Sequence, residues 1–161
     1  MSGNGQWTIE DLLTLASDTA IEAGGLLLER PGKAPDRIGT KAGAGDIVTD
    51  ADRDSESLII QRLLAARAED GIIAKERGAF TGSTGLNWVI DPLDGSANYV
   101  RGATPFAVSV AACDAIEGRS LSPLVGAVFD PAQREIFRAA LDTSGVHQLL
   151  HPSAKGTGSA A

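Results

Sequence analysis

A chain of 161 residues is long enough to bury the core of one domain, and 43% hydrophobic with 22% charged residues is typical of a globular protein. The net charge of -7, with no evident basic patch, argues against a surface for nucleic acid or for anionic membranes. The single cysteine, Cys113, excludes an internal disulfide framework, and no apolar stretch is long enough to cross a bilayer, so we expect a cytoplasmic location.

The N-terminal part of the chain predicts two helices. Thr8 precedes Asp11 by three residues, as in a capping box, and apolar residues at helical spacing predict a helix from about Ile9 to Glu29. Thr49 and Asp52 have the same relation at the start of a second helical pattern. The buried stripe of this second helix is formed by Leu58, Ile59, Leu63 and Leu64. We therefore expect both helices to pack on a common core.

The remaining segments predict mainly β structure. Residues 32–45, between the two helices, are rich in Gly, Lys and Pro and predict a loop or a loose hairpin. Short apolar runs predict strands at Gly71–Ala74, Trp88–Ile90, Ala107–Ala111, Leu124–Asp130 and Glu135–Ala140. The last two are joined by a short turn that contains proline, which indicates a hairpin. Helices first and strands after predict an α+β fold, with two helices packed on an antiparallel sheet.

The candidate chemistry lies in the stretch Asn87–Asn98. Its apolar run ends at an Asp-Pro step, because proline has no N–H with which to continue a ladder, and an Asp-Gly step then turns the chain. Asp91 and Asp94, three residues apart on one bend, can face a common centre beside the Leu93 carbonyl and the Ser96 hydroxyl. This is an all-oxygen set of the kind that Mg²⁺ prefers. The alternative is that both steps are ordinary turn formers.

Three segments together resemble the signatures of the inositol monophosphatase family. Residues 88–100 read Trp-Val-Ile-Asp-Pro-Leu-Asp-Gly-Ser-Ala-Asn-Tyr-Val, residues 46–52 read Asp-Ile-Val-Thr-Asp-Ala-Asp, and residues 126–131 read Gly-Ala-Val-Phe-Asp-Pro. The resemblance implies a magnesium-dependent phosphatase that hydrolyses a small phosphorylated polyol or sugar with a metal-activated water. It also implies the first half of a layered α/β sandwich.

The resemblance also implies roles for individual residues. From local sequence alone, Asp52 is as well explained as a first-turn acid that favours the helix dipole. In the family, the residues corresponding to Asp52 and Ser96 orient the attacking water. The implied metal ligands are Asp91, the Leu93 carbonyl and Asp94. The implied substrate-binding residues are Asp94, Gly95, Ser96 and Ala97.

One position departs from the family pattern. The family has Gly-Glu-Glu after its third predicted element, and the first glutamate binds metal, whereas this chain has Ala74-Lys75-Glu76. A protonated ammonium cannot coordinate Mg²⁺ and repels it. Glu76 would point the other way on an extended segment, so it could serve as the ligand only after a local register shift. Lys75 therefore favours the alternative of a catalytically impaired homologue that acts as a binding or partner-dependent module.

The resemblance covers about Ile9 to Ala140, roughly half of a family member. We therefore expect a family-like domain at residues 1–141 and a flexible tail at 142–161. No Trp-Asp-x-Ala-Ala-Gly motif of the family's second half is recognised, and we expect this chain alone to be weakly active or inactive. The resemblance implies a homodimer, and apolar surface that a second half would cover favours self-association.

Two histidines near the C-terminus were considered as metal ligands. His147 and His151 have the i, i+4 spacing of a helical metal pair, but Gly145 and Pro152 flank them and no third ligand is near. This pattern favours an incidental pairing.

Overall fold

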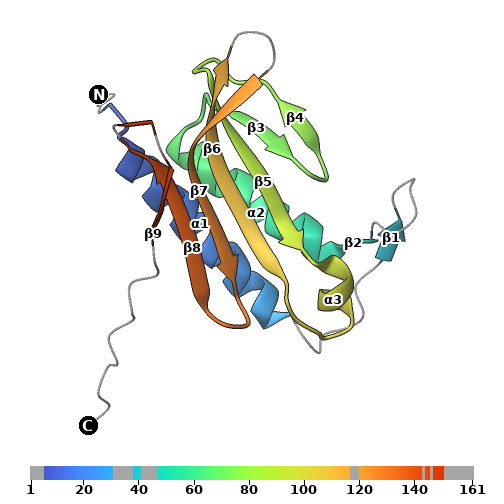
Figure 1. The fold of residues 1–161 in the computed structure, drawn as a ribbon. Coiled ribbons are helices and arrows are strands. Elements are labelled where there is room, and N and C mark those ends of the chain that lie inside the picture. Colours follow the sequence, from blue (N-terminus) through green and yellow to red (C-terminus); the bar gives the residue numbers. More distant parts are fainter. Residues whose placement is uncertain are drawn as a thin grey trace.

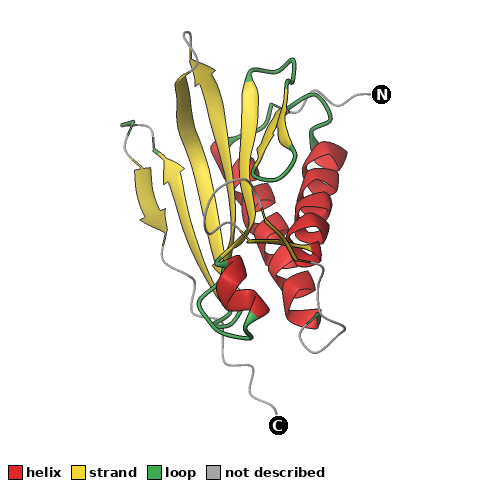
Figure 2. Cartoon of the chain, turned by 90° about the vertical axis from the view of Figure 1, so that its right-hand side faces the viewer, coloured by secondary structure: helices red, strands yellow, loops and turns green. Residues whose placement is uncertain are grey.

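The computed structural model describes residues 6–30, 38–40, 47–116, 120–142, 144–145 and 147–150. Two long helices lie side by side on one face of a broad sheet (Figure 1), and the view from the edge shows the two layers (Figure 2). Within the described part of the chain, no helix covers the opposite face of the sheet. The α+β class predicted from the sequence is confirmed.

The elements follow one another in an order that separates the long helices from most of the strands. They are α1 (Ile9–Glu29), β1 (Ile38–Thr40), β2 (Ile47–Thr49), α2 (Asp50–Ala66), β3 (Gly71–Ala74), β4 (Gly78–Phe80), β5 (Leu86–Asp94), α3 (Ser96–Val100), β6 (Ala107–Ile116), β7 (Ser120–Asp130), β8 (Glu135–Leu141) and β9 (His147–Leu150). None of these helices is both long and apolar enough to cross a membrane.

Two sheets are described. Strands β1 and β2 form a small antiparallel pair, and the other seven strands form one sheet in the order β4-β3-β5-β6-β7-β8-β9. Neighbours in this sheet are antiparallel, except that β3 and β5 are parallel. This pairing corrects our expectation of a wholly antiparallel sheet. It arises because β4 runs back along the outer edge of β3, and the chain then crosses to the inner edge, where β5 takes the direction of β3.

Both predicted capping boxes are present. The Thr8 hydroxyl accepts the N–H of Asp11 at 3.1 Å, and the Asp11 carboxylate accepts the N–H of Thr8 at 2.9 Å. Thr49 and Asp52 make the same reciprocal pair at the start of α2. Each box supplies acceptors for N–H groups that a helix cannot satisfy internally. The predicted bounds of the first helix are confirmed.

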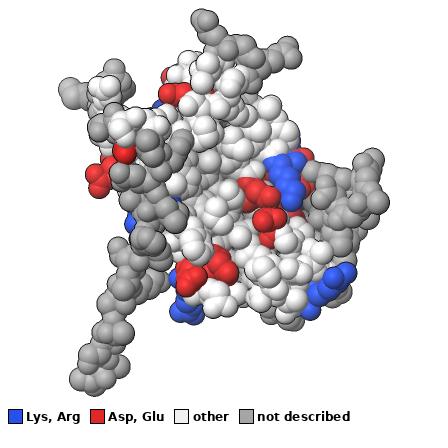
Figure 3. Space-filling model, in the orientation of Figure 1, with Lys and Arg blue, Asp and Glu red and all other residues white. Residues whose placement is uncertain are grey.

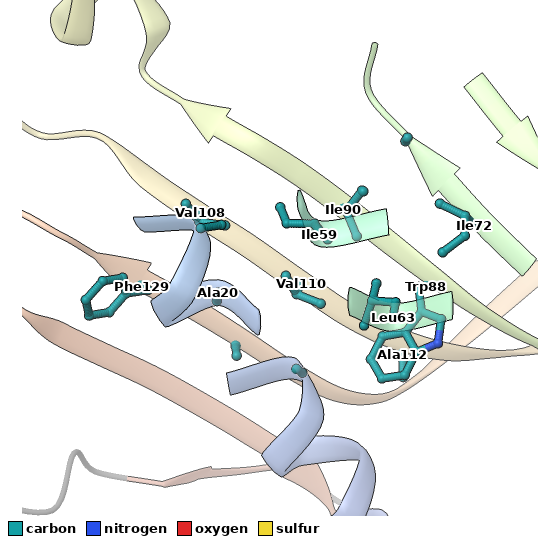
Figure 4. Close-up of a cluster of buried hydrophobic side chains, with 14 of the residues drawn as sticks. Ala20, Ile59, Leu63, Ile72, Trp88, Ile90, Val108, Val110, Ala112 and Phe129 are labelled. Atoms are coloured by element: carbon teal, nitrogen blue, oxygen red, sulfur yellow. The ribbon is translucent and has the colours of Figure 1, made fainter. Parts of the chain in front are cut away.

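The core lies between the sheet and helices α1 and α2. Small residues on α1 let this helix approach β7 closely: a Cβ added at Gly24 would lie 2.4 Å from the Phe129 ring. Trp88 is the largest fully buried side chain. Around it and along the sheet lie Ile59, Leu63, Ile72, Ile90, Val108, Val110 and Ala112 (Figure 4). Burying an aliphatic side chain of this size stabilises the fold by roughly 1.5–3 kcal/mol, so this layer holds the site's scaffold together.

A buried carboxylate joins the end of α2 to strands β3 and β5. Asp70 is 4% exposed and accepts hydrogen bonds from Arg67, from the Thr84 hydroxyl at 2.7 Å and from the Trp88 indole N–H at 2.9 Å. The Arg67 guanidinium also lies over the Trp7 ring, 5.0 Å from its centre. These contacts fix where β3 begins, and β3 in turn carries Lys75 to the site.

The sheet continues beyond the boundary expected from composition. Strand β9 pairs antiparallel with β8, from Leu141 opposite His147 to Arg138 opposite Leu150. This backbone pairing corrects the expected start of a flexible tail at residue 142, because the ladder extends to Leu150. The helical spacing considered for His147 and His151 does not apply, since His147 lies in a strand. His151 and the rest of the C-terminus lie outside the described residues.

Candidate functional site

Asp52 and Ser96 are brought together from distant parts of the chain. Asp52 lies in the first turn of α2 and is fully buried, and Ser96 begins α3. The Ser96 hydroxyl donates to Asp52 Oδ1 at 2.8 Å. Asp52 Oδ2 accepts the N–H of Thr49 at 2.9 Å and the Thr49 hydroxyl at 2.7 Å. The contact that the resemblance implied is therefore present, while its role toward a water molecule stays a prediction.

The bend that presents Ser96 depends on an irregular strand end and on a glycine. The pairing of β5 with β6 shifts register between Asp91 and Asp94, where the chain leaves the sheet. Gly95 follows with φ of +84°, and a Cβ there would lie 2.8 Å from the Pro105 carbonyl oxygen. Both the left-handed backbone and this close approach require glycine. The geometry places Ser96 directly over the end of β5.

Side chains from α2 and α3 hold this bend in place. The Ser55 hydroxyl on α2 donates to the Pro92 carbonyl at 2.7 Å, and the Ser96 hydroxyl also donates to the Leu93 carbonyl at 3.1 Å. The Tyr99 hydroxyl on α3 donates to the Leu27 carbonyl near the end of α1, at 2.7 Å. The site is thus held by hydrogen bonds that cross between layers.

Lys75 contacts one of the predicted metal ligands. Strands β3 and β5 pair in regular register up to Ala74 opposite Ile90, so the next residues, Lys75 and Asp91, are neighbours. Lys75 Nζ lies 3.5 Å from Asp91 Oδ2, and the two side chains are 33% and 31% exposed. The space-filling view shows basic and acidic side chains in contact over the ends of these strands, on an otherwise largely uncharged face (Figure 3). An ion pair therefore lies where the family pattern has a carboxylate.

The turn after β3 is held by a buried glutamate on α2. Glu56 is fully buried, and its Oε2 accepts the backbone N–H of Glu76 at 2.9 Å. Arg77 Nε lies 3.2 Å from Glu56 Oε1. A register shift would be needed to turn Glu76 toward the predicted metal position. The structure does not have this shift, because Lys75 lies beside Asp91.

Several carboxylates surround the single Lys75 ammonium, and this affects the pKa values of both Lys75 and Asp91. Burial lowers the pKa of Lys75, but Asp91, Asp52 and Glu76 together raise it above that of a free lysine. Burial raises the pKa of Asp91, and the Lys75 charge offsets only part of this rise. The two pKa shifts are consistent with each other. Lys75 is attracted by several carboxylates, whereas Asp91 is partly buried, attracted by one ammonium and repelled by the charge of Asp94. Lys75 is therefore charged at neutral pH.

The predicted magnesium ligands do not form a magnesium site as they stand. In the described ranges, no three His, Cys, Asp or Glu side chains converge in a way that could hold a metal ion. Asp91 faces an ammonium, the Leu93 carbonyl accepts a hydroxyl, and both oxygens of Asp52 accept hydrogen bonds. Asp94 is exposed. The donor set of this chain therefore does not fit Mg²⁺ while Lys75 is present.

The predicted phosphate contacts lie at the start of a very short helix. Gly95 is the N-cap of α3, and Ser96 and Ala97 are its first two residues. Their N–H groups have no acceptor inside the helix, which is the geometry that favours an anion at longer helices. Because α3 has only 5 residues, its dipole adds little to any such contact. Binding of phosphate here stays a prediction.

Sequence reasoning missed Glu56 and Ser55, the two α2 side chains that hold the site. A weak signal was available, because Asp52, Ser55 and Glu56 have the i, i+3, i+4 spacing of one helix face. Ile59 and Leu63 continue the same face into the core. Polar residues at the start of an apolar stripe thus marked the part of α2 that faces the site.

Comparison with known proteins assigns this arrangement to a family. The inositol monophosphatase family profile matches residues 8–152, which extends beyond the Ala140 limit of the resemblance. The Nus factor SuhB of Pasteurella multocida is 36% identical over 129 residues, covering 80% of this chain and 46% of that protein. The inositol-1-monophosphatase of Mesorhizobium japonicum is 35% identical over 127 residues, covering 78% and 46%.

Solved structures share the fold over a similar extent. The extragenic suppressor protein suhB from Bartonella henselae superposes with a TM-score of 0.72 and 27% identity, over 84% of this chain and 50% of that one. The IMPase of Thermotoga maritima gives a TM-score of 0.64 and 28% identity, over 82% and 48%. The chain spans about half the length of the relatives that it matches. It belongs to the inositol monophosphatase family.

Proposed function

We propose that this chain carries part of a phosphomonoesterase site that hydrolyses a small phosphorylated polyol or sugar. The observation that supports this proposal is the buried hydrogen bond between Ser96 and Asp52, 2.8 Å long. Because the Ser96 proton is directed to the carboxylate and to the Leu93 carbonyl, the lone pairs of the serine oxygen remain available to accept a hydrogen bond from a water molecule. A water held in this way has its own lone pair free to attack phosphorus.

The surroundings of Ser96 suit a phosphate ester. The N–H groups at the start of α3 would contact the phosphate oxygens, and the exposed Asp94 carboxylate would accept hydrogen bonds from hydroxyls of a polyol or sugar. Positioning and charge stabilisation supply most of the catalysis of phosphoryl transfer. The chain supports positioning, but its residues do not fit the magnesium ion on which the family's activity depends. We therefore propose that hydrolysis by this chain alone is slow.

A second candidate is a catalytically impaired homologue that acts as a binding or partner-dependent module. The contact between Lys75 and Asp91 favours it, because it removes a carboxylate from the predicted metal site. The relatives carry two kinds of name, a Nus factor and an inositol-1-monophosphatase, so the names alone do not choose between the two candidates. A cytoplasmic location and self-association through the face of the sheet on which no described helix packs belong to the proposal in either form.

The test is an assay of inositol 1-phosphate hydrolysis with the purified chain in the presence of Mg²⁺. We expect slow turnover that Ser96→Ala reduces at least tenfold, roughly the effect of losing a positioned hydrogen bond to the attacking water. Ser57→Ala is the matched control: this serine on α2 donates to the Arg53 carbonyl and accepts from Arg77 at the surface, so its loss should leave turnover unchanged.

Two other results would redirect the proposal. Turnover that is equal in the wild type and in Ser96→Ala would show that the buried pair does not act on water, and the proposed mechanism would be wrong. A folded chain without any turnover would leave the second candidate as the function.

A further inference from the structure

We propose that the Lys75 ammonium is a built-in counter-ion: it balances the negative charge of the acidic loop, the bend at Asp91–Asp94 beside Asp52, in place of a divalent cation. The proposal concerns charge balance and metal response, so it does not depend on whether the chain hydrolyses a phosphate ester. Three features support it: the position of the ammonium, the way in which its backbone is held, and the state of the neighbouring oxygen atoms.

The ammonium lies where a cation would be most effective. Lys75 Nζ is 3.5 Å from Asp91 Oδ2 and is also attracted by the charges of Asp52 and Glu76. A divalent cation bound by Asp91 would lie a few ångströms from Nζ, where two positive charges repel strongly. The two cations therefore compete for one place, and the ammonium is covalently attached at that place.

The backbone that carries Lys75 is fixed. The parallel pairing of β3 with β5 brings Lys75 next to Asp91, and the buried Glu56 carboxylate accepts the N–H of Glu76 directly after it. The same carboxylate lies 3.2 Å from Arg77 Nε. A register shift that placed Glu76 instead of Lys75 beside Asp91 would break the hydrogen bond between the Glu76 N–H and the buried Glu56 carboxylate, which would cost stability. Glu56 is therefore a positioning residue for the ammonium.

The neighbouring oxygen atoms have internal donors. Thr49 and Ser96 donate to the two oxygens of Asp52, and Ser96 also donates to the Leu93 carbonyl. The Leu93 N–H donates to Asp91 Oδ1 at 3.3 Å. With Lys75 at the other oxygen of Asp91, the carboxylates of Asp52 and Asp91 and the Leu93 carbonyl are all contacted by donors of this chain, while Asp94 is exposed to solvent. The fold of this loop should then be insensitive to Mg²⁺.

The experiment measures metal binding and unfolding, not turnover. MgCl₂ is titrated calorimetrically into the wild type, Lys75→Met and Lys75→Glu, and the thermal unfolding of each is recorded with and without Mg²⁺. Arg53→Met is the control, because it removes an equal charge from an exposed pair with Asp50. We expect the wild type and the control to show no saturable binding and no change in Tm.

The two Lys75 variants should gain what the wild type lacks. Lys75→Met should show saturable Mg²⁺ binding that the control lacks, and Lys75→Glu should bind Mg²⁺ at least about tenfold more tightly than Lys75→Met, each with a rise in Tm on adding Mg²⁺. The proposal is overturned if wild-type binding is saturable and is lost in Asp91→Asn. It is equally overturned if folded Lys75→Met and Lys75→Glu respond to Mg²⁺ no more than Arg53→Met. Neither result depends on hydrolysis, so this proposal and the proposed function can fail separately.

Discussion

The two carboxylates at the centre of the site, Asp52 and Asp91, are held in different ways. Asp52 is fully buried, and neutral donors from Thr49 and Ser96 satisfy both of its oxygens. Asp91 is about one third exposed, and its nearest cation is the Lys75 ammonium. Asp52 is held by a helix cap, whereas Asp91 is held by a charged side chain and the Leu93 N–H.

This difference separates what the fold requires from what one substitution can change. The Asp52 contacts also begin α2, so their loss would damage the structure whether or not the chain is an enzyme. The Asp91 contact is made at the rim of the sheet and can be altered without disturbing the core. The buried hydrogen bond between Asp52 and Ser96 can therefore be kept while the surroundings of Asp91 change.

The largest expected effect is on the buried pair. Asp52→Ala removes the acceptor of the Thr49 N–H, the Thr49 hydroxyl and the Ser96 hydroxyl, and should lower the free energy of unfolding by about 3 kcal/mol. The same change at Asp11, in the exposed capping box of α1, should cost about 1 kcal/mol. Urea unfolding of both variants gives the comparison. Equal losses would mean that burial does not distinguish the two caps.

A smaller effect on the free energy of unfolding is expected where α2 contacts the irregular end of β5. Ser55→Ala removes the donor to the Pro92 carbonyl and leaves that carbonyl without it inside the core, so we expect a loss of about 1–2 kcal/mol in urea unfolding. Ser57→Ala on the same helix should change the free energy of unfolding by less than about 0.5 kcal/mol. If Ser55→Ala does not change the free energy of unfolding, the end of β5 keeps its shape without this hydrogen bond from α2.

The ion pair should contribute less, and its contribution should depend on pH. The pKa of Lys75 is raised in the folded chain, so its stabilising effect is fully present below the unfolded value of 10.5 and is lost as the pH rises through the folded pKa. Because both side chains are partly exposed, Lys75→Met should cost no more than about 1 kcal/mol at pH 8. The difference from the wild type should shrink above pH 10.5. A difference that grows there would have the wrong sign for this pair.

Local signals explain which parts of the fold could be predicted. The capping boxes are four-residue patterns, so the sequence predicts the starts of α1 and α2 correctly, and it predicts the turn with Pro131 between β7 and β8 for the same reason. The parallel pairing of β3 and β5 and the addition of β9 depend on backbone partners far along the chain. No local pattern encodes such partners, so these features became visible only in the structure.

The site divides in the same way. Asp52 and Ser96 are 44 residues apart, and only the family signatures indicated that they meet. Glu56 was overlooked because a glutamate inside a helix is ordinarily exposed. Lys75 was recognised as a departure from the family pattern, but its contact with Asp91 follows from strand register, which the sequence alone does not fix.

The smallest effect is also the most direct test of the contrast between the two acids. Burial raises the pKa of Asp91, and the charge of Lys75 lowers it in part. Lys75→Met removes the largest lowering influence and leaves burial, the Leu93 N–H and the charge of Asp94, so the pKa of Asp91 should rise further, as followed by the carboxyl ¹³C shift in an NMR titration. Arg53→Met removes an equal charge away from the pair and should leave the titration of Asp91 unchanged. If Asp91 titrates alike in the wild type and in Lys75→Met, the Lys75 ammonium does not interact with Asp91 in solution, and it is not the counter-ion of this carboxylate.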